Sequence, residues 1–180
     1  TNMGIVGRVN YDYQSKYLAE VSFRYDGSSK FAKGHRWGFF PSASVGYRIS
    51  EESFIKEFAP LSFITNWKLR ASYGAMGDDG SSSYQYLSGY DYPGASYVFG
   101  DVVYKGLVFR GLPNELITWY KSKTLNVGTD LDLWNGMLSA QVDFFWRYRD
   151  GLLGKRSGEV PGTIGAELPE ENLNQDLYKG

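Results

Sequence analysis

Residue types that could carry out nucleophilic chemistry meet at one place in the sequence, around the single histidine. His35 follows Asp26 and a serine pair at positions 28 and 29. Triads of this kind usually combine distant segments of a chain, and a short polar run like this one is more typical of a solvated loop. A lone histidine also excludes a metal site made of several imidazoles. The sequence therefore indicates no enzyme.

Three further motifs have the wrong spacing for the sites that they resemble. The stretch GKRS at 154–157 lacks the upstream glycine of a phosphate-binding loop. DLDLWNG at 130–136 places a tryptophan where a calcium loop needs an oxygen ligand. GDDGSSS at 77–83 could hold calcium, but a polar turn is the simpler interpretation. We expect no metal and no cofactor.

The elements that would position any site are strands, because apolar and polar residues alternate along most of the chain. In YLAEVSFRYD, Tyr17 to Asp26, every second residue is apolar or aromatic. The same period recurs in six segments, each about ten residues or longer, and that length exceeds the usual strand of a globular sheet. The six segments are 4–13, 17–26, 37–50, 66–76, 122–134 and 137–151.

Short connections join some of these segments. Gln14-Ser15 and the hairpin dipeptide Asn135-Gly136 are expected to form tight turns. Ser50 and Ser53 with the neighbouring glutamates predict a capped helical turn. The connections 77–116 and 151–180 are long. Short turns at one end and long loops at the other are typical of a transmembrane β-barrel.

The polar face of the predicted strands is rich in charge. A water-filled or plugged lumen tolerates such a row, so we interpret these residues as lumen-facing and the apolar row as facing the lipid bilayer. The lumen-facing set is Arg8, Glu20, Arg24, Arg48, Lys68, Arg70, Asp130, Asp132, Asp143 and Arg147.

Aromatic residues gather near both ends of the strands, as expected for headgroup anchoring. The alternative is a soluble antiparallel sheet whose apolar face packs on a second sheet, and alternation alone does not separate the two. One aromatic group, around the short turns, is Tyr11, Tyr13, Tyr17 and Trp134; the other, near the long loops, is Phe23, Tyr25, Trp37, Phe39, Trp146 and Tyr148.

Composition limits the partners and the kinds of site that the chain can have. A formal net charge of −1 gives no bulk attraction to nucleic acid, so no nucleic-acid partner is expected. The absence of cysteine excludes disulfides and thiolate metal sites. No apolar run is long enough for a membrane-spanning helix, and the first residues do not resemble a signal peptide.

Several motifs in order resemble the barrel of SusC/RagA-type TonB-dependent transporters: GRVNYDYQSKYLAEVSFRYDGSSKFAKGHRWGFFPSASVGYRISEESF, LRASYGAMGDDG and LITWYKSKTLNVGTDLDLWNGMLSAQVDFFWRYRDGLL. The resemblance implies part of a plugged barrel of about 22 strands in the outer membrane of a Gram-negative bacterium. It also implies import of oligosaccharides or peptides, a SusD-like surface lipoprotein as partner, and energy supplied through the TonB complex.

The resemblance covers the chain to about Leu153 and implies an interior fragment from the later part of the barrel. Residues 1–180 are then one partial barrel domain without signal peptide, plug or TonB box, and its partners include the remainder of its own barrel and plug. The C-terminal NLNQDLYKG resembles the start of another strand. Other functions remain open at this stage, namely a passive porin-like channel and a soluble β-rich carbohydrate-binding module.

The long connection at 77–116 is interpreted as an extracellular loop and as the best candidate for contact with a partner or substrate. Its stretch YVFGDVVYKGLVFRG alternates enough to form a small hairpin. Tyrosines suit self-packing of the loop, burial against a partner and stacking on a glycan, and these roles are compatible. The candidate residues are Tyr84, Tyr86, Tyr90, Tyr92, Tyr97 and Phe99.

Overall fold

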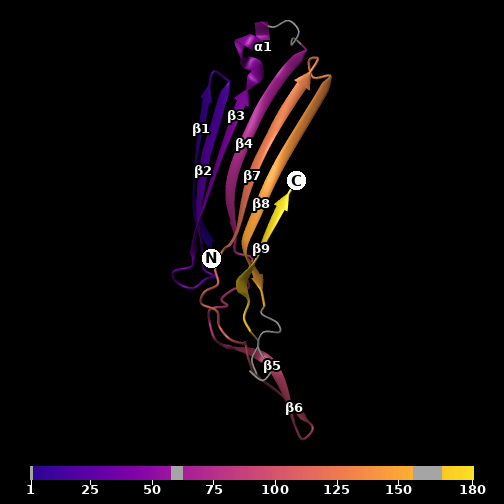
Figure 1. Ribbon diagram of the computed structural model, residues 1–180. Helices are drawn as coiled ribbons and strands as arrows, with labels where there is room; N and C mark the ends of the chain where they lie inside the picture. The colour runs from indigo at the N-terminus through magenta and orange to yellow at the C-terminus, as the bar shows by residue number, and fades with distance from the viewer. Residues whose placement is uncertain (1, 58–62, 156–167) are drawn as a thin grey trace.

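A computed structural model describes residues 2–57, 63–155 and 168–180. Its main feature is one antiparallel sheet of seven long strands in the order β1-β2-β3-β4-β7-β8-β9 (Figure 1). The strands are β1 (Asn2–Tyr13), β2 (Tyr17–Ser28), β3 (Trp37–Arg48), β4 (Ile64–Asp78), β7 (Tyr120–Leu133), β8 (Leu138–Gly154) and β9 (Glu171–Lys179). The antiparallel sheet predicted from the alternation is confirmed.

The predicted tight turns are present, and their backbone conformations explain their sequences. Gln14 and Ser15 both have positive φ, 54° and 55°, as the central residues of a type I′ turn do. The β7–β8 connection has positive φ at Trp134, Asn135 and Gly136. Such left-handed residues match the twist of the flanking strands, which fixes the register of both hairpins.

The strand count was too low by one in this sheet. The connection predicted at 151–180 is shorter, because β8 continues to Gly154 and β9 pairs with it, and the expectation that NLNQDLYKG begins another strand is confirmed. Gly151 has φ 76° at a register shift, and this bulge interrupts the alternation. β9 has two leucines on one face, Leu173 and Leu177, separated by Gln175, so its apolar period is weaker than that of the other strands.

At the short-turn end, β3 leads into a 3₁₀ turn, η1 (Ile49–Glu51), and a single helical turn, α1 (Ser53–Glu57). The predicted helical turn is confirmed, but its predicted cap is wrong. The residue before η1 is Arg48, which makes no capping hydrogen bond through its side chain, and Ser50 is buried within the turn.

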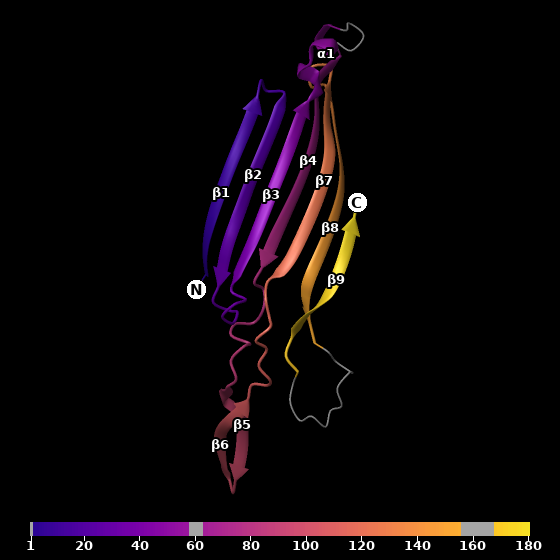
Figure 2. The same ribbon diagram turned by 60° about the vertical axis from the view of Figure 1, so that its left-hand side comes forward.

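At the opposite end the β4–β7 connection projects far beyond the sheet (Figure 2). Because β4 runs to Asp78 and β7 begins at Tyr120, this connection is slightly longer than the predicted 77–116. It contains a separate two-stranded hairpin, β5 (Tyr90–Phe99) and β6 (Val102–Phe109), which confirms the expected hairpin.

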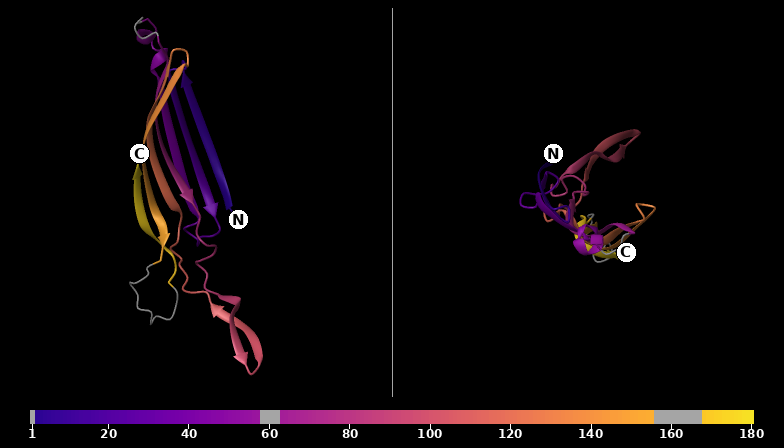
Figure 3. Two further views of the ribbon diagram at one scale, coloured as in Figure 1. Left: turned by 90° about the vertical axis from the view of Figure 1, so that its right-hand side faces the viewer. Right: turned by 90° about the horizontal axis from the view of Figure 1, so that it is seen from above.

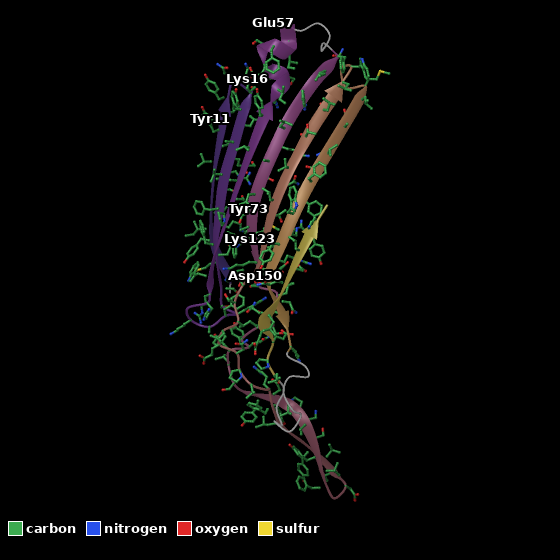
Figure 4. All side chains as sticks on the ribbon, viewed as in Figure 1. Tyr11, Lys16, Glu57, Tyr73, Lys123 and Asp150 are labelled. Carbon is green, nitrogen blue, oxygen red and sulfur yellow. The ribbon has the colours of Figure 1, made fainter. Side chains whose placement is uncertain are left out.

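The sheet is a single curved layer, as the view from above shows (Figure 3). In the part of the chain that the structure describes, side chains stand off both faces of the sheet and no second layer of elements lies against either (Figure 4). Within the described ranges, no helix is long and apolar enough to cross a membrane. The buried hydrophobic cluster is small and lies at the loop end, and it comprises Phe31, Phe40, Ile117 and Trp119, with Leu153 packed against it.

Candidate functional site

The candidate site is the sheet itself, because its register separates polar and apolar residues onto opposite faces. Val21 of β2 lies opposite Val9 on one side and Ala43 on the other. The next residue, Ser22, lies opposite Arg8 and Ser42. Since side chains alternate between faces, the same separation continues across β4, β7 and β8.

All ten charged residues predicted to be lumen-facing share the polar face. The polar face continues from β4 to β7, where Lys68 lies opposite Asp130 and Arg70 lies opposite Gly128. It continues from β7 to β8, where Gly128 lies opposite Asp143. The members of this face are Arg8, Glu20, Arg24, Arg48, Lys68, Arg70, Asp130, Asp132, Asp143 and Arg147. Which compartment the face meets stays a prediction.

Ion pairs and hydrogen bonds link much of this polar face. Arg70 Nη2 lies 2.7 Å from Asp143 Oδ2 and 3.3 Å from Asp130 Oδ1. Asn66 donates to Asp132 at 3.0 Å. These side chains are only partly exposed, so the pairs are screened less than pairs on an open surface. Cations and anions are mixed, and the face has no single strong sign.

The polar face is also the hollowed one. One hollow of about 510 Å³ is lined by Glu20, Lys68 and Arg70 among others. A second, of about 530 Å³ and nearer the loops, is lined by Arg24 and Trp119 among others. A sheet that is concave on its charged side is the geometry expected of a barrel wall seen from within.

The opposite face is apolar and uncovered by the described residues. Val9 is 71% exposed, Val21 58% and Val45 59%, although all three lie in the middle of long strands. A soluble sheet would bury this row against a second layer. Contiguous exposed apolar surface of this kind marks an interface with lipid or protein.

Aromatic pairs bound the apolar row at both ends, as predicted. Tyr17 stacks on Tyr47 with ring centroids 5.1 Å apart at the short-turn end. Tyr25 stacks on Trp37 at 4.8 Å at the loop end. Tyr17 and Tyr25 are eight residues apart along β2, which is roughly 26 Å of strand at about 3.3 Å per residue. The apolar band of an outer-membrane barrel is about 25 Å tall.

A cluster of polar side chains holds the connections together at the short-turn end of the sheet. Glu52, just before α1, accepts hydrogen bonds from Lys16 Nζ, Tyr17 Oη and Tyr47 Oη, each at 3.2 Å. The Lys16 hydrogen bond, reinforced by the tyrosines, lowers the pKa of the Glu52 carboxyl against the opposing effect of burial. This cluster ties the η1–α1 segment to the β1–β2 turn.

A second polar cluster anchors the long loop, and it accounts for the motif once considered for calcium. Asp79 Oδ2 accepts from Ser28 Oγ at 2.7 Å and from Asn2 Nδ2 at 3.0 Å, and Lys30 Nζ donates to its carbonyl at 2.8 Å. Burial raises the pKa of the Asp79 carboxyl, but these partners outweigh it and the net shift is downward. Among the described residues no group of three or more acidic, histidine or cysteine side chains could hold a metal ion.

The candidate triad is not assembled. The Ser28 hydroxyl donates to Asp79, and Asp26 accepts from Arg24 Nε at 3.1 Å. The hydrogen bonds recorded for His35 are made by its backbone: its N–H donates to Ala32 O at 3.1 Å and its carbonyl accepts from Thr118 Oγ1 at 3.4 Å.

Sequence reasoning missed the structural importance of the residues just before β7. Trp119 packs against Phe31 and Phe40 with ring centroids 5.5 and 5.4 Å apart, and its Nε1 donates to Arg36 O at 3.0 Å. These contacts hold the β2–β3 connection over the polar face at the loop end. Ile117 and Trp119, two large apolar residues outside any alternating segment, were the available indication.

The loop tyrosines are divided between two places. Tyr84 and Tyr86 lie in a turn before the hairpin, with their rings 6.3 Å apart. The other four candidates lie on β5, where Tyr92 is 68% and Phe99 70% exposed. Part of the set packs within the hairpin, since Tyr90 contacts Phe109 and Phe99 contacts Tyr104. The exposed remainder is available for a partner.

Comparison with known proteins identifies the family. The family profile described as TonB dependent receptor-like, beta-barrel, matches residues 1–176. The chain belongs to this family. Its sheet is part of a β-barrel of this family and resembles the SusC/RagA type, as the sequence resemblance predicted.

Named relatives support the same assignment. The chain is 34% identical over 178 residues to TonB-dependent receptor P3 of Formosa agariphila, and this covers 99% of the chain but 17% of that protein. It is 33% identical over 183 residues to TonB-dependent receptor SusC of Bacteroides thetaiotaomicron, covering 99% of the chain and 18% of SusC. The chain thus spans under a fifth of the length of these relatives.

Solved structures share the fold. The RagAB peptide importer in its closed-closed state superposes with a TM-score of 0.81 at 23% identity, covering 99% of this chain and 18% of that one. The open-open state of the same importer gives a TM-score of 0.76. The matched relatives are named as receptors and transporters rather than enzymes.

Proposed function

We propose that this chain forms part of the wall of an active transporter in the outer membrane of a Gram-negative bacterium. The transporter imports oligosaccharides or peptides with a SusD-like surface lipoprotein and takes its energy from the TonB complex. In this proposal the polar face lines a plugged lumen of a barrel of about 22 strands, and the apolar face meets lipid. The neighbouring strands at β1 and β9 come from the remainder of the same barrel.

One observation carries the proposal: a single sheet whose apolar row, bounded by aromatic pairs such as Tyr17–Tyr47 and Tyr25–Trp37, lies uncovered opposite a hollowed and ion-paired polar row. Lipid would cover the apolar row over the height that the aromatic pairs mark out. Water, plug and cargo would meet the polar row.

The long β4–β7 connection belongs on the extracellular side in this arrangement, because outer-membrane barrels have long loops outside and short turns in the periplasm. Its β5–β6 hairpin is apolar on both faces, with Val98 and Val103 on one and Phe99 and Tyr104 on the other. A lone two-stranded ribbon is at best marginally stable in water. We therefore infer that the SusD-like lipoprotein sits on the barrel as a lid and covers this hairpin.

The test is uptake by cells that carry the full-length transporter. Radiolabelled neutral oligosaccharides and tryptic peptides are supplied separately, with TonB intact or inactivated. An active importer takes up cargo of at least one class when TonB is intact and loses that uptake when TonB is inactivated. Uptake that continues unchanged without TonB would instead indicate the passive porin-like channel.

A further inference from the structure

Charged side chains interrupt the apolar face of the sheet in one region only. In the part of the chain that the structure describes, the apolar rows of β1, β2, β3 and β4 carry no charged residue. Up to the register shift that follows Asp150, the rows of β7, β8 and β9 carry four, all in the loop half of the sheet, where Figure 4 labels two of them. The four are Lys121, Lys123, Asp150 and Lys179.

The register of the strands places the lysines on the same face as the apolar rows. Lys123 lies opposite Tyr148, one step beyond the apolar pair of Leu125 and Trp146. Lys179 lies opposite Trp146 on the other side. Because directly opposed residues of antiparallel strands share a face, these lysines belong to the face that is proposed to meet lipid.

The lysines of β7 lie at the height where the hydrocarbon region of a membrane ends. The apolar row of β7 starts at Leu133, and Lys123 lies ten residues away, roughly 33 Å at about 3.3 Å per residue. With a strand tilt of about 35–45°, this length gives about 25 Å of height, which is the height of the apolar band of an outer-membrane barrel. Lys121 lies two residues further toward the loops, so both ammonium groups reach the headgroup level on the side of the long loops.

The three lysines are available to a ligand. Each is exposed, and none forms an ion pair with another described residue. Asp150 lies opposite Lys121 and accepts a hydrogen bond from Gln175 Nε2 at 3.0 Å. Past the register shift, toward the loops, one further residue of each sign follows, Glu171 and Lys155. Positive charge therefore exceeds negative charge in this region.

Tyr148 lies between two of the lysines. Lys123 is its directly opposed neighbour on β7. Lys179 is its diagonal neighbour on β9, because Tyr148 lies opposite Leu177. Diagonal neighbours are about 7–8 Å apart and within reach of long side chains. Two ammonium groups and a phenolic O–H can therefore converge on one anionic group.

We propose that Lys121, Lys123 and Lys179, the outward lysine cluster, bind together with Tyr148 the phosphate of a lipid headgroup in the outer leaflet. Continuity with the apolar row favours a lipid over a soluble anion, because acyl chains cover Trp146 while the headgroup accepts from the lysines. Phosphate suits the cluster, since it offers several acceptor oxygens to separate point charges. The inference rests on the proposed function in placing the apolar face against lipid and the long loops outside, and it adds the class of lipid.

The test is binding of fluorescently labelled lipid A, a phosphorylated glycolipid of this leaflet, to the purified full-length transporter in neutral detergent. Dephosphorylated lipid A tests the need for phosphate, and inorganic phosphate as competitor separates a headgroup from a free anion. The variants are Lys121→Gln, Lys123→Gln and Lys179→Gln, singly and together, and Asp150→Asn. Lys33→Gln is the matched control, because Lys33 is an exposed lysine at the same end of the sheet but outside the apolar rows.

We expect each cluster substitution to weaken lipid A binding about fivefold, as for one lysine near an anionic surface, and the triple variant about a hundredfold. Asp150→Asn removes the opposing charge and should tighten binding, and Lys33→Gln should leave it unchanged. Unchanged binding in the triple variant, equal binding of dephosphorylated lipid A, or displacement by millimolar inorganic phosphate would overturn the inference. Equal losses for Lys33→Gln and the cluster variants would also overturn it, because they would report net charge alone.

The binding assay requires no transport, so its failure is distinct from failure of the proposed function. Normal TonB-dependent uptake with lipid A binding that ignores the cluster would count against this inference alone. Absent uptake with cluster-dependent lipid A binding would count against the transporter and leave the lipid site standing.

Discussion

Arg70 of β4 reaches across β7 to form an ion pair with Asp143 of β8, with Nη2 and Oδ2 2.7 Å apart. The residue of β7 between them in register is Gly128. A Cβ at position 128 would overlap the Asp143 carboxylate. The missing side chain is thus what allows an ion pair to span three strands of the polar face.

Gly128→Ala is therefore expected to lower the free energy of unfolding of the full-length barrel by about 1–3 kcal/mol, through overpacking and a weakened ion pair. Urea unfolding in lipid vesicles measures this free energy of unfolding. Gly74→Ala is the matched control on the same face, because a Cβ there meets only Ser42 at an ordinary 3.5 Å. Equal effects at both positions would show that Gly128 has no special role.

The two faces should respond differently to charge. Val142→Arg places a guanidinium in the lipid-facing row of β8, five residues into the strand, and should cost up to about 2–4 kcal/mol of barrel stability. Gln141→Arg, one residue away on the polar face, lies opposite Asp130 and should cost much less. Urea unfolding in lipid vesicles compares them, and a similar loss for both would contradict the assignment of the faces.

The Glu52 cluster makes the short-turn end sensitive to acid. Because the pKa of Glu52 is lowered in the folded protein, its contribution is present above the unfolded pKa of about 4.3 and is lost as pH falls through the folded value. The thermal midpoint of the native barrel should then fall more between pH 6 and pH 3.5 than that of Glu52→Gln. Glu57→Gln removes a charge from exposed α1 and should retain the native pH dependence. If the thermal midpoints of the native protein and Glu52→Gln fell in parallel with pH, the Glu52 carboxylate would not be the source of the acid sensitivity.

The β5–β6 hairpin should be dispensable for folding of the barrel but required for binding of the lipoprotein. Replacing 90–109 by Asn-Gly joins Gly89 to Arg110, which are already hydrogen-bonded at 3.0 Å. We expect a folded barrel that no longer co-purifies with its lipoprotein, with reduced uptake. The double variant Val98→Ser, Val103→Ser changes one apolar face only and should weaken co-purification partly. Normal co-purification and uptake after deletion would leave the hairpin as loop packing.

The sequence predicted those parts of the fold that depend on one strand at a time. Alternation in β2 and its neighbours identified both faces, since each side chain's face follows from its position in the strand. β9 has only a weak period, since Gln175 separates Leu173 from Leu177 on the same face, and its sequence was identified by its resemblance to the start of a strand and not by alternation.

Contacts between distant segments could not be predicted in the same way. The Arg70–Asp143 pair depends on the register of three strands, and the Gln85–Glu170 contact joins residues 85 positions apart. Neither contact produces a pattern in the sequence around its residues. The Trp119 cluster likewise forms only when the connections at the loop end fold over the sheet.

Cysteine labelling of the full-length barrel in its membrane measures directly which face of the sheet meets lipid. Single cysteines at Val21, Phe23 and Val142 are compared with single cysteines at Glu20, Arg24 and Asp143, using a lipid-soluble maleimide and a membrane-impermeant, water-soluble one. We expect the lipid-soluble reagent to label the first set and the water-soluble reagent to favour the second. Equal labelling of both sets by the lipid-soluble reagent would contradict a wall with one face to lipid and the other to the lumen.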